Sequence, residues 1–251
     1  MKIGFLGTGT IASAMVQCLA SGNHQIVISE RNRTISAELS QKYSNVNVAD
    51  NQTVIDISDV VIICLLADVA QSILPALTFR PDQKILSVMV GFSFEELSSL
   101  VSPAVYEAVF IPYPFIKRGN SPLLVYPQSD TLQALFGEQN ELIRMQSEAD
   151  LQSYLAAQAI LLPTVNLLNN SVEWLQKRVG DTVSAEKFIR LLVGGYLTAE
   201  SLDQPGVLAE AMVDLGTEGG LNAQLRDHFA QHGVYDALAD GLDQLEKRLS
   251  D

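Results

Sequence analysis

The first 90 residues alternate short apolar runs of strand length with amphipathic stretches of helical period. The runs at residues 60–66 and 84–90 are continuous rather than alternating, which is typical of strands covered on both faces. Residues 67–77 between them have the pattern of a crossover helix. Because such connections are right-handed, this order predicts an α/β fold with a Rossmann-type, doubly wound and mostly parallel sheet. The expected strands are residues 2–7, 24–30, 46–50, 60–66 and 84–90.

The pattern changes in the second half of the chain. Residues 109–127 are rich in proline, and two closing strands are expected around a short helix at 130–138. From about Asp150 onward the strand signal disappears, and residues 149–179 and 184–202 are helical patterns with apolar residues on all sides, as buried or interface helices have. We therefore expect a Rossmann domain over residues 1–147 and an all-helical dimerisation domain over 148–251.

A glycine loop follows the first predicted strand. Gly7-Thr8-Gly9-Thr10-Ile11-Ala12 matches G-x-G-x-x-G/A, with a strand before it and an amphipathic helix after it. Gly7 makes the tight turn, Gly9 lets the backbone approach a pyrophosphate, and Ala12 keeps the helix close to the sheet. The unpaired N–H groups at the helix start favour phosphate. We expect Gly7, Thr8, Gly9, Thr10 and Ile11 to bind a dinucleotide; an unliganded strand-to-helix turn is the alternative.

The end of the second strand carries groups that discriminate between the two nicotinamide dinucleotides. An acidic residue there binds the ribose hydroxyls of NAD, whereas arginine accepts the additional phosphate of NADP. The segment Ser29-Glu30-Arg31-Asn32-Arg33 supplies both kinds of group. Glu30 favours NAD, while Ser29 and the arginines, Arg31 above all, favour a phosphate. The sequence therefore predicts NADP as cofactor, with NAD possible.

Composition narrows the classes of partner. Lys+Arg 16 against Asp+Glu 29 gives a formal net charge of −13, which disfavours nucleic acid. Residues 1–146 carry 9 basic and 13 acidic groups, and 147–251 carry 7 and 16, so the N-terminal half is the less acidic. No uninterrupted apolar run reaches 18 residues, and we expect no membrane span. Cys18 and Cys64 lie in apolar runs and suggest buried free thiols in a reducing, cytoplasmic compartment.

The order of these segments resembles the pyrroline-5-carboxylate reductase family over most of the chain. The opening MKIGFLGTGTIASAM is similar to the start of that family, and Asn51-Gln52-Thr53-Val54 with the segment 58–62 is similar to its N-x-E-V…A-D-V-V. The segment 86–91 is similar to its I-S-x-x-A-G-V turn, and Pro112 with Pro114 falls at its M-P-N-T-P. The resemblance implies an NAD(P)H-dependent reductase that makes proline from a cyclic imine carboxylate, in a homodimer or larger homo-oligomer formed through the helical domain. It also implies that Asn51 approaches the adenosine side of the cofactor.

The sequence departs from that family where substrate is expected. The family's A-V-K-P is Cys64-Leu65-Leu66-Ala67 here, and its S-P-G-G-T-T is Thr217-Glu218-Gly219-Gly220-Leu221-Asn222. We expect Leu65 to contact the cofactor, Thr217 and Asn222 to be catalytic, and Gly219 and Gly220 to cradle the substrate through backbone N–H groups. Thr217 is alternatively an N-cap, with the glycines in an ordinary turn.

Other candidate residues are weaker. Tyr113 and the pair Lys117-Arg118 border the expected nicotinamide edge of the sheet, where they are able to hold an anionic substrate or simply face solvent. His228 and His232 are four residues apart on a helix, but no third ligand is evident and no metal is expected.

Three functional hypotheses follow from the sequence. The first is a reductase of a small imine or oxo acid, and the second is a dinucleotide-binding sensor or scaffold of the same fold that has lost catalysis. The third, a hydroxyacid dehydrogenase, is disfavoured because no lysine occurs between Asp150 and Trp174.

Overall fold

The computed structural model describes residues 1–250, and the chain divides into two compact units. The first unit runs Met1–Leu151 and the second begins at Gln152. Ser147, where the sequence suggested a boundary, lies in the turn between the last strand and the first helix of the long helical region. The two units are described separately below.

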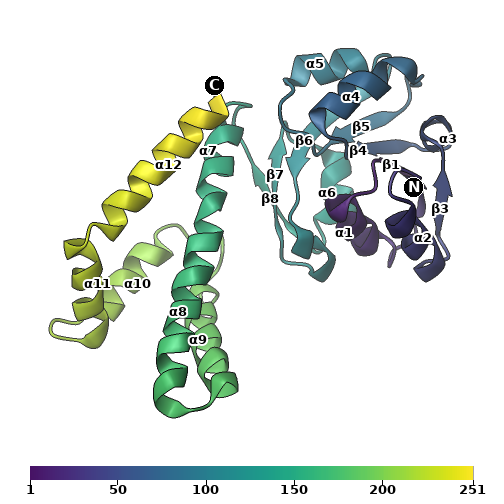
Figure 1. The fold of residues 1–251 in the computed structure, drawn as a ribbon. Helices are drawn as coiled ribbons and strands as arrows, with labels where there is room; N and C mark the ends of the chain where they lie inside the picture. Colours follow the sequence, from purple (N-terminus) through teal and green to yellow (C-terminus); the bar gives the residue numbers. More distant parts are fainter. Residues whose placement is uncertain (251) are drawn as a thin grey trace. The chain divides into compact units, whose positions relative to one another are not determined.

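A single eight-stranded sheet forms the centre of the first unit (Figure 1). Its order is β3-β2-β1-β4-β5-β6-β7-β8, and neighbouring strands are parallel except for β6 and β7, which are antiparallel. The strands are β1 (Lys2–Leu6), β2 (Gln25–Ser29), β3 (Val46–Ala49), β4 (Val60–Ile63), β5 (Lys84–Ser87), β6 (Val105–Ile111), β7 (Pro122–Tyr126) and β8 (Glu141–Arg144). The predicted doubly wound, mostly parallel sheet is therefore confirmed.

Helices cover both faces of the sheet, and the side chains of each strand alternate between two apolar cores. In β4, Val60 and Ile62 belong to one core and Val61 and Ile63 to the other. The first core includes residues of α1, α2, α6 and η2, and the second includes residues of α3, α4, η1 and α5. These elements are α1 (Thr10–Leu19), α2 (Arg33–Lys42), α3 (Asn51–Asp56), α4 (Ala67–Ile73), η1 (Leu74–Ala76), α5 (Phe94–Leu100), η2 (Pro114–Arg118) and α6 (Asp130–Phe136).

The sequence overestimated two strands and missed two elements. The apolar runs 60–66 and 84–90 extend past the ends of β4 and β5, and their last residues form turns at the carboxyl edge of the sheet. Strand β6 was not predicted, because prolines at 103, 112 and 114 suggested an irregular segment. Helix α3 was not predicted either, because its six residues are too short to show a helical period.

The second unit consists of helices alone (Figure 1). They are α7 (Asp150–Ala157), η3 (Gln158–Ile160), α8 (Leu161–Val179), α9 (Thr182–Leu197), α10 (Val207–Leu215), α11 (Leu221–Gln231) and α12 (Val234–Ser250). Helix α8 ends at Gly180, which has the left-handed φ of +73°. The next residue, Asp181, caps α9 through a 3.1 Å bond from the Ser184 N–H, so a two-residue turn joins α8 to the α9 helix beside it.

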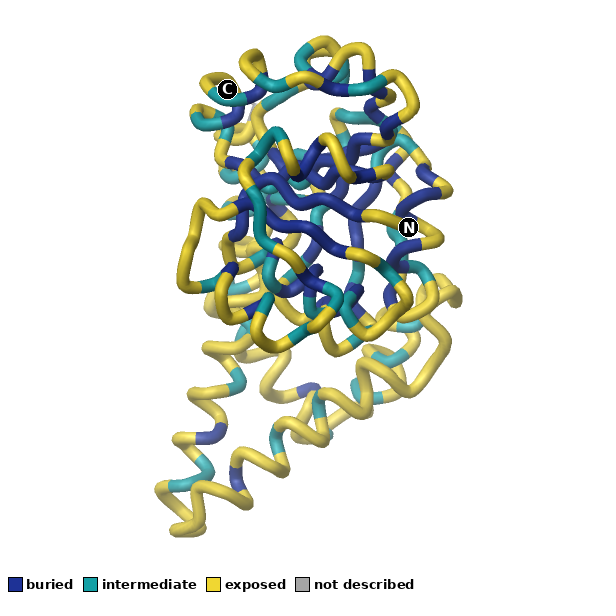
Figure 2. Tube along the Cα trace, turned by 90° about the vertical axis from the view of Figure 1, so that its right-hand side faces the viewer, coloured by how far each residue is buried: buried dark blue, intermediate teal, exposed yellow. Residues whose placement is uncertain are grey.

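Much of the apolar surface of these helices is exposed within the single chain (Figure 2). Leu162 is 75% exposed and Val183 is 77% exposed. The sequence predicts no membrane span because no uninterrupted apolar run is long enough. The 30-residue stretch Asp150–Val179 nevertheless has the length and mean hydropathy of a membrane-crossing helix, which by itself is weak evidence for a span. Only 11% of its most apolar window is buried. Exposed apolar surface of this extent is more than a soluble monomer usually presents.

Candidate functional site

The glycine loop joins the end of β1 to the start of α1. Gly7 has a φ of +95°, and a Cβ at this position would collide with the carbonyl oxygen of Cys64, the residue directly after β4. Only glycine fits both the conformation and the space. The turn therefore brings the chain from β1 into α1 immediately beside the end of β4.

Gly9 serves a different purpose from Gly7. It is the N-cap residue of α1, has an extended backbone with φ −98°, and makes no side-chain cap bond. A Cβ at Gly9 would meet nothing within 4 Å and would project into open space in front of the helix. The N–H groups of the first turn of α1 have no intrahelical partner, so this space suits a pyrophosphate. Ala12 is 1% exposed and holds α1 close to the sheet.

Two hydroxyls attach the glycine loop to the end of β2. The Ser29 Oγ accepts a 2.8 Å hydrogen bond from the Gly7 N–H, and the Thr8 Oγ1 donates a 2.6 Å bond to the Ser29 carbonyl oxygen. Both side chains are buried. Thr8, predicted to contact the cofactor, thus holds the loop in place through Ser29. Since Ser29 accepts from Gly7, its own hydrogen remains to be donated.

A hollow of about 470 Å³ opens at the carboxyl ends of β2, β3 and β4. It brings together four residues that the sequence predicted to bind the cofactor, Ser29, Arg31, Asn51 and Leu65. Its remaining lining residues are Glu30, Arg33, Asp50, Val69 and Ile73. Val69 and Ile73 were missed; they lie four residues apart on α4, a spacing that places both on one face of that helix.

The charges around this hollow are not equivalent. Asp50 caps α3, accepting bonds of 3.0 Å from the Thr53 N–H and 2.6 Å from the Thr53 Oγ1, and these hydrogen bonds lower the pKa of its carboxyl. Neither Arg31 nor Arg33 forms an ion pair within residues 1–250, and both are exposed. The hollow is therefore lined by two guanidinium groups, by the carboxylates of Glu30 and Asp50, and by the buried Ser29.

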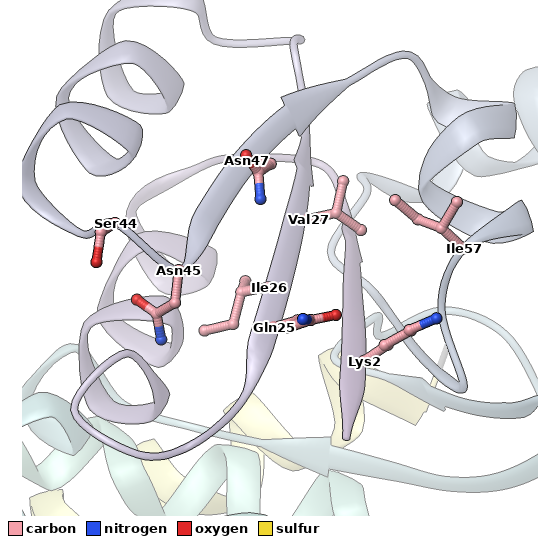
Figure 3. Close-up of a pocket in the computed structure, with 8 residues that line it drawn as sticks. All are labelled: Lys2, Gln25, Ile26, Val27, Ser44, Asn45, Asn47 and Ile57. Atoms are coloured by element: carbon pink, nitrogen blue, oxygen red, sulfur yellow. The ribbon is translucent and has the colours of Figure 1, made fainter.

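A second hollow of similar volume lies at the opposite edge of the sheet (Figure 3). Its lining side chains come from the amino ends of β1, β2 and β3 and from adjoining turns, and include Lys2, Gln25, Asn47 and Ile57. Ligands of doubly wound sheets bind outside the carboxyl ends of the strands. No residue that the sequence singled out as a site residue lines this second hollow, so the functional site is assigned to the carboxyl edge.

The strand ends farther along the sheet carry Tyr113. Its ring stacks on Phe115 with the centroids 5.9 Å apart, and burial raises the pKa of its hydroxyl. Ile116 is buried with the α1 side chains in the first core, which fixes η2 against the sheet. Lys117 and Arg118 follow in the last turn of η2 and are exposed.

The predicted substrate residues lie in the second unit, in the turn before α11. Gly220 is the N-cap of that helix and no side chain caps it, so Thr217 is not an N-cap. The Gly220 N–H donates a 2.9 Å bond to the Thr217 carbonyl oxygen, and Gly219 has a φ of +73°. The N–H of Gly220 is therefore engaged within the turn. Asn222 lies exposed in the first turn of α11.

The two C-terminal histidines are neighbours without a metal-binding set around them. The rings of His228 and His232 lie 4.2 Å apart, and the His232 Nδ1 is 2.7 Å from the His228 carbonyl oxygen. Within the described part of the chain, no group of three or more His, Cys, Asp or Glu is placed to hold a metal ion.

Comparison with known proteins agrees with this architecture. Residues 2–91 match the family model described as NADP oxidoreductase, coenzyme F420-dependent. The structure of pyrroline-5-carboxylate reductase from Streptococcus pyogenes superposes with a TM-score of 0.78 at 21% identity, covering 99% of this chain and 98% of that chain. The chain has the pyrroline-5-carboxylate reductase fold. The resemblance expected from the sequence is confirmed at the level of the fold.

Other solved structures share the fold. Plasmodium falciparum pyrroline carboxylate reductase with NADP bound gives a TM-score of 0.79 at 15% identity, covering 99% of this chain and 97% of that chain. Imine reductase from Pseudomonas sp. gives a TM-score of 0.64 at 19% identity, covering 99% of this chain and 91% of that chain. No curated protein matches the sequence. The fold is thus that of NAD(P)-dependent oxidoreductases related to pyrroline-5-carboxylate reductases and imine reductases.

Proposed function

We propose that this chain is an NADPH-dependent reductase of the C=N bond of a small cyclic imine. The observation that carries the proposal is the continuous carboxyl edge, where the capless start of α1 adjoins a hollow lined by Ser29, Arg31 and Arg33. The resemblance to pyrroline-5-carboxylate reductases makes pyrroline-5-carboxylate, and its reduction to proline, the first reaction to test.

The preference for NADP over NAD rests on the polar groups of the hollow. A 2′-phosphate placed there would accept hydrogen bonds from the Ser29 hydroxyl and from one or both arginines, which are charge-assisted and therefore strong. Glu30 is the group that would instead suit the ribose hydroxyls of NAD. Asp50 is a second carboxylate of the hollow, and its oxygens accept hydrogen bonds from Thr53. The preference for NADP therefore rests on the two guanidinium groups, which would pair with a 2′-phosphate and not with a ribose hydroxyl. A relative of the same fold has NADP bound.

The residues of the first unit would hold and orient the cofactor. The Gly9 backbone and the first turn of α1 would bind the pyrophosphate, and Leu65, Val69 and Ile73 would supply an apolar wall for the adenine. When bound, the nicotinamide supplies the hydride. The reaction transfers that hydride to the imine carbon and a proton to the nitrogen, and releases the amine and the oxidised cofactor. A cyclic imine is basic enough to arrive protonated, so orientation provides most of the catalysis.

On the substrate side, the predicted roles of Thr217 and Asn222 in catalysis, and of Gly219 and Gly220 in substrate binding, stay part of this proposal. Because the Gly220 N–H donates to the Thr217 carbonyl oxygen, the donors of this turn would be the N–H groups of the first residues of α11. The positive φ of Gly219 and the uncapped N–H groups of α11 support an anion-binding or carbonyl-binding turn there. Asn222, in the first turn, offers both a donor and an acceptor beside those N–H groups.

We further propose that the second unit forms a homodimer with the same unit of another chain. A hollow of about 590 Å³ between α8, α9 and α11 is lined by large apolar side chains that include Trp174, Phe188 and Phe229. A second copy of equally apolar helices would fill it and cover the exposed stretch Asp150–Val179. The unpaired cysteines support a reducing, cytoplasmic location.

The alternative that the sequence left open is a binding protein of the same fold without catalysis. Leu221 favours it, because this apolar residue is 85% exposed at the start of α11, where the resembling family has a threonine. Measurable turnover of an imine substrate decides between a reductase and a binding protein without catalysis.

The test of the proposed function is NADPH consumption, followed by absorbance, with pyrroline-5-carboxylate, other cyclic imines and 2-oxo acids as substrates. We expect consumption with a cyclic imine and none with the Gly9→Asp variant, whose carboxylate would occupy and repel the pyrophosphate site. Cofactor binding without turnover on any substrate would contradict the proposal and favour the sensor.

A further inference from the structure

Helix α1 lies between two elements that follow different strands. Helix α2, after β2, packs on one side of α1, and the 3₁₀ helix η2, after β6, packs on the other. The hollow proposed for the adenosine side of the cofactor includes the ends of β2 and β3, on the α2 side. A dinucleotide whose pyrophosphate lies at the start of α1 would therefore extend its nicotinamide toward the η2 side.

The position of η2 along α1 is fixed at two points. Ile116 is buried among the side chains of α1 in the first core. Directly after η2, the Asn120 N–H donates a 2.6 Å bond to the Gln139 carbonyl oxygen. The side-chain oxygen of Gln139 lies 3.9 Å from the sulfur of Cys18, in the last turn of α1. The end of η2 is therefore near the end of α1, and the start of η2 lies toward the start of α1.

The lengths of the two elements place Tyr113 close to the glycine loop. At a rise of about 2 Å per residue for a 3₁₀ helix, the chain from Asn120 back to Tyr113 spans about 14 Å. At about 1.5 Å per residue, α1 spans about the same length from Cys18 back to Gly9. Both elements begin at the carboxyl edge of the sheet. Tyr113 therefore lies level with the first turn of α1, on the side expected for the nicotinamide.

The Tyr113 ring is held in place while its hydroxyl is free. The Tyr113 carbonyl oxygen accepts a 3.0 Å bond from the Ile116 N–H, and the ring stacks on Phe115 with the planes 21° apart. Among residues 1–250, the hydroxyl has no hydrogen-bond partner. Burial raises the pKa of this hydroxyl above the ordinary 10, so it is neutral at physiological pH. A neutral hydroxyl is both a donor and an acceptor.

The other groups expected near a substrate suit the nitrogen of a protonated imine less well, because that nitrogen is a donor and requires an acceptor. Residues 64–67 after β4 and 88–91 after β5 have no hydroxyl, amide or charged side chain. The N–H groups at the start of α11 are donors and suit a carboxylate. Thr217 and Asn222 offer acceptors, but both side chains are exposed, whereas Tyr113 is half-buried and already ordered.

We propose that Tyr113 is a catalytic residue whose hydroxyl oxygen accepts a hydrogen bond from the protonated imine nitrogen and so orients the imine carbon toward the nicotinamide. This inference rests on the proposed function and adds a residue to it. The hydride passes to the imine carbon, and the π electrons of the C=N bond become the lone pair of the amine nitrogen. The proton on that nitrogen stays there, so Tyr113 orients the substrate without losing its own proton.

The experiment compares wild type with Tyr113→Phe on pyrroline-5-carboxylate and on 1-pyrroline, which has the same ring without the carboxylate. With NADPH saturating, we expect kcat to fall at least about tenfold on each imine that the wild type reduces, because a hydrogen bond to a charged group is lost. KM should change less than about threefold, since a misoriented imine still binds. The Kd for NADPH, measured by fluorescence, and the Tm should match wild type, because the ring is kept.

The matched control is Tyr43→Phe. This tyrosine lies between α2 and β3 at the amino edge of the sheet, where it packs partly buried against the first core. Loss of its hydroxyl should leave kcat, KM and the Kd for NADPH at their wild-type values.

The outcomes separate this inference from the proposed function. An unchanged kcat for Tyr113→Phe would place the nitrogen elsewhere, and a raised KM with unchanged kcat would assign Tyr113 to substrate affinity, including binding of the carboxylate. A raised Kd for NADPH would assign Tyr113 to the cofactor. Each of these results would overturn the inference and leave the C=N reductase in place. Binding of NADPH by wild type without reduction of these or any other imine would overturn both.

Discussion

Ser29 shows how one residue joins two parts of a binding site. Its carbonyl and its hydroxyl both bond the glycine loop, while the residue also lines the hollow that contains Arg31 and Arg33. The glycine loop and the hollow are therefore attached to each other through a single residue. Arg31 and Arg33 form no ion pair among the described residues and are exposed. We therefore expect substitutions of these two arginines to change cofactor affinity without lowering the stability of the fold.

At this scale the prediction concerns Arg31. We expect Arg31→Ala to raise the Kd for NADPH about tenfold or more and to leave the Kd for NADH within about twofold, because only NADPH has the 2′-phosphate that the guanidinium would bind. Separate fluorescence titrations with the two cofactors measure both constants. Lys42→Ala removes an exposed cation at the end of α2, outside the hollow, and serves as the matched control. Equal weakening of both cofactors by Arg31→Ala would contradict the assignment.

At the scale of elements, the sequence predicted those parts of the candidate site that are formed by residues adjacent in the chain. The glycine loop, the end of β2 and Asn51 are contiguous motifs, so the sequence identified them and the structure places several of them around one hollow. Val69 and Ile73 join that hollow only because α4 packs over β4, which no local pattern reveals.

Strand β6 also illustrates how a polar group stabilises an element. Glu107 lies 2.7 Å from the Lys84 Nζ on β5 and accepts a 2.7 Å hydrogen bond from the Ser129 Oγ, the N-cap of α6. The Lys84 Nζ also donates a 2.9 Å bond to the Thr131 Oγ1. Burial opposes ionisation of the Glu107 carboxyl, but hydrogen bonds from Lys84, Thr131 and Ser129 outweigh it and lower its pKa below the ordinary 4.5. This network joins β5, β6 and α6.

We therefore expect Glu107→Gln to lower the Tm at pH 7. Since the pKa of the carboxyl is lower in the folded state than in the unfolded state, its stabilisation is fully present above the unfolded value and is lost as the pH falls through the folded value. The difference in Tm between wild type and variant should be constant from pH 7 to about pH 5.5 and narrow below about pH 4.5. Thermal unfolding followed by circular dichroism measures it. Glu141→Gln, an exposed carboxyl on β8, should show no such dependence; a pH-independent gap for Glu107→Gln would contradict the network's ionic character.

At the scale of the whole molecule, charge and apolar surface are distributed unequally between the two units. The formal net charge of −13 is concentrated after residue 147, in the same helices that expose most of the large apolar side chains. Acidic and apolar groups on one set of helices are compatible if the apolar faces meet each other and the carboxylates remain in water. A homodimer of the second unit satisfies both requirements.

Trp174 is the only tryptophan in the chain, so its fluorescence emission reports on whether the second unit forms a dimer. In the single chain it is 58% exposed, with the Arg178 guanidinium 3.8 Å from its ring centroid, and it lines the hollow between α8, α9 and α11. If a second copy fills that hollow, dilution should shift the Trp174 emission to the red together with a halving of the sedimenting mass. Leu162→Glu should produce the same shift at higher concentration. Emission independent of concentration in a sedimenting monomer, or co-sedimentation with phosphatidylcholine vesicles, would contradict the dimer.

The hydrogen bond from Gly7 to Ser29 restricts how this protein could be redesigned. Exchanging cofactors in a dinucleotide-binding enzyme usually means introducing an acidic side chain at the end of the second strand. At position 29 that exchange would replace the buried Oγ that accepts from the Gly7 N–H with a larger, charged side chain, and would disturb the bond that fastens the glycine loop to β2. An engineer seeking an NADH-dependent variant would therefore keep Ser29, use the carboxylate already present at Glu30, and change Arg31 and Arg33 alone.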